Sequence, residues 1–294
     1  MAQILKGSEV VEFINSEATK KVEDLKNKGI VPTLAILRVG DKADQISYEK
    51  SAVKRCDTIG VAVKNVVLPE DITQDDVIQS ITGLNEDNKV HGVLILRPLP
   101  KHINDDVVRA ALCTSKDVDG ITDGSLAGVF TGQAPSKTAG FACANPLGFA
   151  PCTAQACIDI LDFYKIDCTG KRVTVIGRSL VVGKPVAIML MGKNATVTVC
   201  HTRTVDVPKI TKEADIIIAA SGQMESLTGE YFSPEQTVID VGINWNDKKG
   251  KLCGDVLFEE AEPIVAAITP VPGGVGTVTT SVLVSNVIKA AERN

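Results

Sequence analysis

The chain lacks the sequence features of several large classes of protein. It has only three histidines, and its eight cysteines form no C-x-x-C pair, so we expect neither a metal site nor a disulfide framework. No apolar run approaches the length of a membrane helix, and the first residues lack the apolar core of a signal peptide. No block of lysine and arginine stands out in a chain of net charge −5, which argues against a nucleic-acid partner. We therefore expect a soluble cytoplasmic protein with reduced thiols and no membrane contact.

The chain does have the size and composition of two packed α/β domains. Its 294 residues are 44% hydrophobic and 23% charged, which is enough to bury ordinary cores. Helical and strand patterns alternate along the first third, which predicts a parallel sheet with crossover helices and ligands at the carboxyl ends of its strands. The expected helices cover 8–28, 43–58, 74–84 and 105–112, and the expected strands cover 33–39, 61–68 and 92–96.

Residues 114–152 interrupt this alternation with six glycines and three prolines. We expect a long irregular connection there, and its part at 128–150 looks extended. A helix capped by Thr153 should follow, to about residue 166. Further strands are expected at 172–176, 196–200, 215–220 and 237–241, and a last helix at 277–293.

The strand at 172–176 ends in a turn that is typical of a dinucleotide site. Gly177 follows the strand, then Ser179 and Gly183, and Pro185 stands where a helix is expected to start. Strand, glycine turn and helix start direct main-chain N–H groups at a pyrophosphate. The spacing is G-x-S-x-x-x-G and not the usual G-x-G-x-x-G, so an ordinary strand–helix turn is the alternative.

The end of the strand at 196–200 favours NADP over NAD. An NAD site has an acid near this point to bind the ribose 2′-hydroxyl. Here Thr202 and Arg203 follow the strand, and Arg178 lies in the preceding turn. Guanidinium groups bind phosphate through forked donors, so these residues suit a 2′-phosphate. The alternative is that both arginines are solvated surface residues.

Several motifs occur in the order of one known family. They are Tyr48, RPLP at 97–100, KDVDG at 116–120, PCTAQ at 151–155, VIGRSLVVGKP at 175–185, CHTRT at 200–204, DVGIN at 240–244, GDV at 254–256 and TPVPGGVG at 269–276. Together they closely resemble the FolD family of methylenetetrahydrofolate dehydrogenase/methenyltetrahydrofolate cyclohydrolases, over essentially the whole chain.

The resemblance implies a two-domain fold. An N-terminal α/β folate-site domain would comprise residues 1–150 and 273–294, and a Rossmann-like NADP-binding domain would comprise residues 151–272. The family places the folate in a cleft between them, packs the C-terminal helix back on the first domain, and forms homodimers through the NADP domain.

The resemblance also implies an activity in one-carbon metabolism and purine biosynthesis. Family members oxidise 5,10-methylenetetrahydrofolate to 5,10-methenyltetrahydrofolate with NADP. Most then hydrolyse that product to 10-formyltetrahydrofolate. Two alternatives remain open, namely an NADP oxidoreductase for another small substrate and a homologue that binds without catalysis.

The motifs carry the family's site residues onto this chain. Tyr48 matches the tyrosine that lies against the folate aminobenzoate, and Asp119 matches the aspartate that binds the pterin, so both are candidate catalytic and folate-binding residues. A core tyrosine and an Asx-turn aspartate are the alternatives, although we expect Asp117 to be the turn residue. The other matches are Pro272, Gly273 and Gly274 for folate, and Gly177, Arg178, Ser179, Thr202 and Ile243 for NADP.

Two positions depart from the family pattern. The family lysine four residues after the tyrosine is Ala52 here, and the glutamine of the family's V-Q-L-P-L-P segment is Leu96, which we keep as a folate contact. Lys50 and Lys54 lie about 200° around the helix from Ala52, so neither replaces the lysine without a shift of the helix. In the family this lysine polarises the methenyl centre and its attacking water, and the glutamine holds the lysine. We therefore predict a dehydrogenase with weak or absent cyclohydrolase activity, and a fully bifunctional enzyme is the alternative.

Overall fold

The chain divides into two α/β units, each built on its own parallel sheet. The computed structural model describes residues 1–133 and 147–293, so part of the segment expected at 128–150 lies outside the described residues. The three-stranded unit comprises residues 13–133, 147–152 and 280–293, and the six-stranded unit comprises residues 1–12 and 153–279. Within the described residues, no helix is both long enough and apolar enough to cross a bilayer.

The two units divide the chain differently from the expected domains at both ends. Residues 1–12 belong to the six-stranded unit, because β1 (Gln3–Ile4) pairs in parallel with β11 (Ala267–Ile268). Residues 273–279 belong there too, so α10 (Val275–Ala291) is part of the three-stranded unit only from residue 280 onward. A two-residue strand is too short to leave a periodic pattern, which is why the sequence did not reveal β1.

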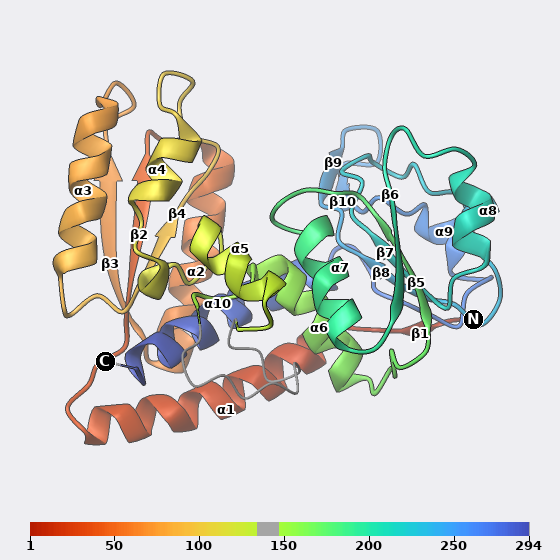
Figure 1. Ribbon diagram of the computed structural model, residues 1–294, viewed down its shortest axis with the longest axis horizontal. Coiled ribbons are helices and arrows are strands. Elements are labelled where there is room, and N and C mark those ends of the chain that lie inside the picture. The colour runs from red at the N-terminus through yellow and green to blue at the C-terminus, as the bar shows by residue number, and fades with distance from the viewer. Residues whose placement is uncertain (134–146, 294) are drawn as a thin grey trace. The chain divides into compact units, whose positions relative to one another are not determined.

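The three-stranded unit is built on a parallel sheet in the order β3-β2-β4 (Figure 1). Its elements are α1 (Gly7–Asn27) from residue 13 onward, β2 (Thr33–Val39), α2 (Ala43–Ile59), β3 (Ala62–Leu68), α3 (Gln74–Glu86), β4 (Gly92–Ile95), α4 (Asp105–Ala111), the 3-10 helix η1 (Thr114–Lys116) and α5 (Asp123–Phe130). Every strand and helix expected before residue 112 is present, with ends shifted by at most two residues. The central strand β2 is buried along six of its seven residues, as is typical of a parallel strand covered on both faces.

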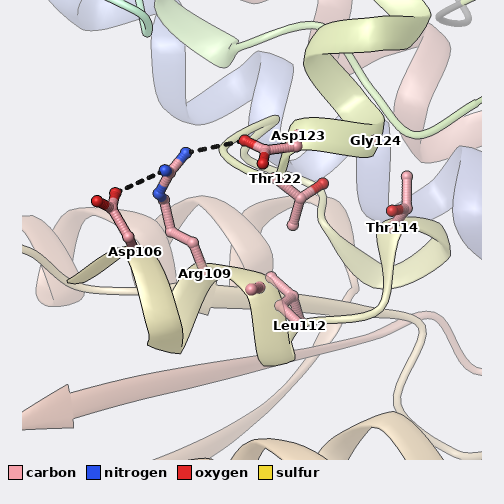
Figure 2. Close-up of a pocket in the computed structure, with 8 residues that line it drawn as sticks. Asp106, Arg109, Leu112, Thr114, Thr122, Asp123 and Gly124 are labelled. Atoms are coloured by element: carbon pink, nitrogen blue, oxygen red, sulfur yellow. Dashed lines mark hydrogen bonds and ion pairs between the residues drawn. The ribbon is translucent and has the colours of Figure 1, made fainter. Parts of the chain in front are cut away.

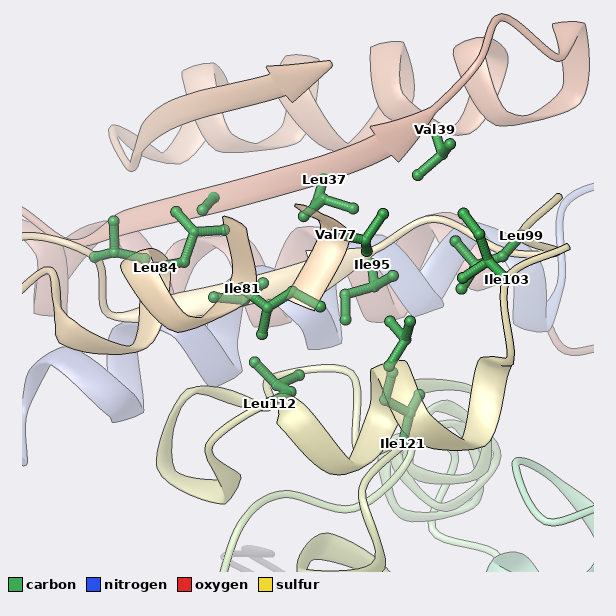
Figure 3. Packing of buried hydrophobic residues seen from close by; sticks show 14 residues of the cluster. Leu37, Val39, Val77, Ile81, Leu84, Ile95, Leu99, Ile103, Leu112 and Ile121 are labelled. Atoms are coloured by element: carbon green, nitrogen blue, oxygen red, sulfur yellow. The ribbon is translucent and has the colours of Figure 1, made fainter. Parts of the chain in front are cut away.

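One hydrophobic cluster fixes α3 and α4 against this sheet. Leu37 and Val39 from β2 meet Val77 and Ile81 from α3 and Ile95 from β4, and none of the five is more than 3% exposed (Figure 3). Burying an aliphatic side chain of this size contributes roughly 1.5–3 kcal/mol. The cluster therefore holds in place the end of β4 and the segment that follows it.

The segment at 114–152 is less irregular than the sequence predicted. η1 and α5 occupy its first half, and Thr122 caps α5 by accepting from the Ser125 N–H at 3.2 Å. Gly128 lies inside α5 because a Cβ there would meet the main-chain oxygen of Leu147. α6 (Cys152–Phe163) begins at Cys152 and not after a Thr153 cap. The glycines therefore serve close packing in part, and do not only interrupt structure.

The six-stranded unit contains one parallel sheet in the order β1-β11-β8-β7-β5-β6, which leaves β6 at an edge (Figure 1). Its remaining elements are β5 (Arg172–Ile176), α7 (Gly183–Gly192), β6 (Thr196–Cys200), α8 (Val207–Lys212), β7 (Ile216–Ala219), the 3-10 helix η2 (Gly229–Tyr231), β8 (Thr237–Asp240), β9 (Asn244–Asn246), β10 (Lys251–Cys253) and α9 (Phe258–Ala261). β9 and β10 form a separate antiparallel hairpin. β5 and β6 have the predicted bounds, whereas α7 begins two residues before the expected Pro185.

Seven cysteines lie among the described residues, and all seven are free thiols. Six are buried, and Cys113 is the exposed one of this set. Burial raises the pKa of the Cys56 and Cys157 thiols to about 12. These buried thiols therefore stay protonated at neutral pH.

Candidate functional site

A buried turn after η1 sets the position of Asp119. Asp117 is fully buried, and its carboxylate accepts hydrogen bonds from the Ile121 N–H at 3.0 Å, the Thr122 N–H at 2.7 Å and the Ser125 hydroxyl at 2.6 Å. Asp117 is therefore the turn residue, as the sequence predicted. Its three bonds close the chain around Asp119, which lies two residues further on.

Asp119, Tyr48 and Cys152 lie together in the three-stranded unit. The Cys152 N–H donates to the Asp119 carbonyl at 3.3 Å, and the Cys152 thiol donates to the neighbouring Val118 carbonyl at 3.3 Å. Burial, and then the charge of Asp117, raise the pKa of Asp119 to about 7, while Arg97 lowers it. Burial and then the charge of Asp119 raise the pKa of Tyr48 well above its ordinary value. The group thus combines an aromatic ring with a carboxyl whose charge is easily removed.

The two departures from the family pattern are both buried. Ala52 is 0% exposed and lies one turn after Tyr48 on the same side of α2. Leu96 is 4% exposed and directly follows β4. Lys50 and Lys54 are both exposed, as their helical positions predicted, so neither ammonium replaces the one missing at Ala52.

The proposed NADP contacts Arg178, Thr202 and Arg203 follow two neighbouring strands. β5 and β6 are paired in parallel with Ile176 opposite Cys200, so the segments after them start at the same edge of the sheet. All three side chains are exposed, and neither arginine forms an ion pair with another residue in 1–133 or 147–293. Two unpaired guanidinium groups near one strand edge are suited to an anionic ligand.

The turn after β5 presents main-chain donors. The Ser179 Oγ accepts from the N–H groups of Val182 and Gly183, at the start of α7, at 3.1 and 3.4 Å, whereas the N–H groups of residues 178–181 donate to no described residue. Gly177 has φ +125°, and a Cβ there would meet the Ala220 main-chain oxygen. A pyrophosphate is bound by main-chain N–H groups that have no other partner, and a glycine lets the backbone approach it closely. This turn therefore fits a dinucleotide.

The strand order places the same turn at a topological switch point. The chain passes from β5 to β6 on one side and continues with β7 on the other side of β5. In open α/β sheets, ligands bind at the carboxyl ends of such strands. Residues 220–222 follow β7 at this point, and the Gly222 N–H donates to Asp255 at 2.8 Å. Sequence reasoning missed this segment, although the glycine after the apolar run was a signal for it.

The other expected ligand residues belong to the six-stranded unit. Gly273 accepts from the Gly7 N–H at 2.7 Å, which ties the 272–274 loop to the start of α1, and Pro272 is exposed while Gly274 is buried. Ile243, which follows β8, is 61% exposed.

A separate cavity of about 200 Å³ lies between α4 and α5 in the three-stranded unit. Figure 2 shows Arg109 between Asp106 and Asp123, which it meets at 2.8 and 3.6 Å, and Arg109 also donates to the Ile121 carbonyl at 2.9 Å. None of the expected site residues lines this cavity. Because the guanidinium is already paired, we assign no ligand to it. Across the described parts of the chain, no three His, Cys, Asp or Glu side chains are grouped to hold a metal ion.

Comparison with known proteins decides the family. Residues 5–119 match the catalytic domain of tetrahydrofolate dehydrogenase/cyclohydrolase, and residues 151–294 match its NAD(P)-binding domain. The chain belongs to this family. The bifunctional protein FolD of Clostridium botulinum strain Hall is 44% identical over 294 residues, which cover 100% of both chains. The membership confirms the resemblance inferred from the motifs.

Solved structures of the family have the same fold. The bifunctional FolD of Campylobacter jejuni is 38% identical, with a TM-score of 0.93 over 100% of this chain and 99% of that one. The FolD of Trypanosoma brucei, solved with NADP and an inhibitor, is 32% identical, with a TM-score of 0.90 over 99% and 98% of the two chains. The expected two-domain α/β fold with an NAD(P)-binding domain is thereby confirmed.

The raised pKa of Asp119 predicts a change of stability with pH. The folded-state pKa of about 7 exceeds the ordinary value of 3.8, so folding favours the protonated form. This stabilisation is complete below a pH of about 4 and is lost as the pH rises through about 7. We expect the free energy of unfolding of the Asp119→Asn variant to increase relative to that of the wild type as the pH rises from about 5 to about 8. Unfolding in urea at both pH values measures the gain.

The exposed Asp75 of α3 offers a matched control. The Asp75→Asn variant should follow the wild type at both pH values. An Asp119→Asn variant whose stability runs parallel to that of the wild type would show that the carboxyl is not held in a low-dielectric site.

Proposed function

We propose that the protein is an NADP-dependent 5,10-methylenetetrahydrofolate dehydrogenase of one-carbon metabolism, with weak or no cyclohydrolase activity. The observation that carries this proposal is the combination of Tyr48 and Asp119 in one group with a fully buried alanine at the position of the family lysine. The chain thus retains the residues proposed to bind and orient a folate, and it lacks the lysine that activates water in the family.

The residues of the three-stranded unit have mainly a positioning task. The Asp119 carboxylate accepts two hydrogen bonds from the amino group and the adjacent ring N–H of a pterin, and Tyr48 offers an aromatic face to the aminobenzoate. Dehydrogenation depends chiefly on holding the methylene carbon against a hydride acceptor, which NADP supplies when bound. In the six-stranded unit, the free amides of residues 178–181 and the guanidinium groups of Arg178 and Arg203 would hold its phosphates.

Hydrolysis of the methenyl product needs a further group. A general acid–base side chain typically contributes about 10²–10⁴-fold. Ala52 has no proton to give, and Leu96 cannot hold a water molecule. Arg97 acts on Asp119 electrostatically, but its guanidinium already pairs with the Asp105 carboxylate at 3.2 Å. The matched relatives are named bifunctional, and this proposal sets the chain apart from them.

Two absorbance assays on one preparation test the proposal. We expect NADPH to form from 5,10-methylenetetrahydrofolate, and we expect 5,10-methenyltetrahydrofolate to hydrolyse close to the buffer background. Hydrolysis at a rate that matches the dehydrogenase would contradict the loss. Absence of NADP reduction would contradict the dehydrogenase itself and favour another small substrate or a non-catalytic homologue.

Restoring the family side chains tests the cause of the expected loss. The Ala52→Lys, Leu96→Gln double variant should hydrolyse the methenyl compound at least about 10²-fold faster than the wild type. The Ala52→Met, Leu96→Gln variant fills the same space without an ammonium group and should not. Equal rates in the two variants would mean that the missing lysine is not the limiting element.

The choice of NADP over NAD should depend on the two exposed arginines. We expect Arg178→Ala and Arg203→Ala each to raise the KM for NADP about tenfold, because each removes a charged donor to the 2′-phosphate, with little change in the KM for NAD. Arg172→Ala, at the exposed start of β5, is the control and should change neither. Parallel changes for both nucleotides would show that the arginines do not read the 2′-phosphate.

We further propose that the protein is a cytoplasmic homodimer formed through the six-stranded unit. β6 is an edge strand, and an unpaired strand edge is a natural template for a second chain. Val199 on β6 and Val205 after it are 39% and 85% exposed, which leaves apolar surface beside that edge. Sedimentation should give the mass of two chains, and the mass of one chain would contradict the dimer.

A further inference from the structure

One side chain of α2 has an oxygen that the fold leaves without a partner. Gln45 is 3% exposed, and its Nε2 donates to the Pro98 carbonyl at 2.9 Å. Its Oε1 is also buried, and it accepts no hydrogen bond from the described residues. Exchanging the amide oxygen and nitrogen would set two acceptors against each other at Pro98, so this contact fixes which atom is free.

This oxygen belongs to the same stripe of α2 as the candidate folate residues. Gln45 precedes Tyr48 by three residues and Ala52 by seven, so at 100° per residue all three lie within about 60° of one another around the helix. Leu96 stands where the family pattern has glutamine, and Pro98 follows it by two residues. A carboxamide absent from position 96 is therefore present on α2, in contact with the same segment.

A buried acceptor without a partner lowers the stability of a fold, and an apolar side chain of the same size would avoid that loss. A ligand that brings an N–H group to this point would complete the hydrogen bonding of the amide. The reduced pterin of a tetrahydrofolate carries a ring N–H at N8 besides the two donors assigned to Asp119. Folic acid, which is oxidised, has an acceptor nitrogen at that ring position and no hydrogen to donate.

We propose that Gln45 is a folate-binding residue whose amide oxygen accepts a hydrogen bond from this ring N–H, so that it selects reduced over oxidised folates. The proposal rests on the proposed function, because it assumes that Tyr48 and Asp119 bind a folate. The hydrogen bond from Nε2 to Pro98 orients the amide in advance, which reduces the entropy lost when the ligand binds.

Binding of tetrahydrofolate and of folic acid to the wild type and to Gln45→Met tests the proposal. Methionine matches glutamine in length and has no comparable acceptor. We expect the Kd for tetrahydrofolate, measured by calorimetry under reducing conditions, to rise about tenfold in the variant. The Kd for folic acid should change less than about twofold, because folic acid has no hydrogen to offer at N8. Gln79→Met, the same change at an exposed position of α3, should leave both values unchanged.

Two results would overturn the inference. One is an unchanged Kd for tetrahydrofolate in the Gln45→Met variant. The other is an equal loss for both ligands, because a displaced Pro98 segment would weaken binding without regard to the oxidation state of the pterin. Gln45→Leu provides a second apolar variant if the methionine variant is unstable.

The same measurements separate this inference from the proposed function. A wild type that reduces NADP while Gln45→Met keeps its affinity for tetrahydrofolate would refute only the role of Gln45. A wild type that binds tetrahydrofolate but forms no NADPH would refute the dehydrogenase, and the binding comparison would still decide on Gln45.

Discussion

A buried carboxylate determines where the candidate folate residues lie. Asp117 accepts three hydrogen bonds from the eight residues that follow it, and these bonds offset the cost of burying its charge. Because the donors belong to the turn and to the start of α5, unwinding either one would remove part of this compensation. The same charge acts on Asp119 two residues away and helps to raise its pKa. Asp117 thus helps to fix the position of the carboxyl proposed to bind the pterin, and it adds to the effect of burial, which is the larger cause of the raised pKa.

Parallel strand pairing plays the corresponding part in the six-stranded unit. The register that sets Ile176 opposite Cys200 makes two separate segments begin at one edge of the sheet, and each carries an arginine that forms no ion pair with a described residue. The Ser179 hydroxyl accepts from the Val182 and Gly183 N–H groups where α7 begins, and the amides of residues 178–181 donate to no residue in the described parts of the chain. The features that suit a phosphate ligand are therefore by-products of how the strand and helix are joined.

The sequence was sufficient to predict a strand or helix where burial leaves a continuous pattern of apolar residues. β2 and β6 were predicted to the residue, because parallel strands carry unbroken β-branched and apolar runs. α5 was missed because its glycines resemble those of a loop, although the cap at Thr122 was a usable signal. The motifs identified Tyr48 and Asp119, but no spacing in the sequence shows that Gln45 meets Pro98, since that contact depends on how a helix packs beside a distant segment.

The uneven exposure of the thiols makes the protein convenient for spectroscopy. A maleimide reacts with thiolate, which the buried cysteines hold only sparingly because burial raises their pKa. Cys113 is the exposed thiol among the described residues and stands directly before η1, six positions ahead of Asp119 in the chain. A fluorophore attached there would report on the turn that carries Asp119, and it would do so in the natural sequence, without the removal of any other cysteine in the described segments.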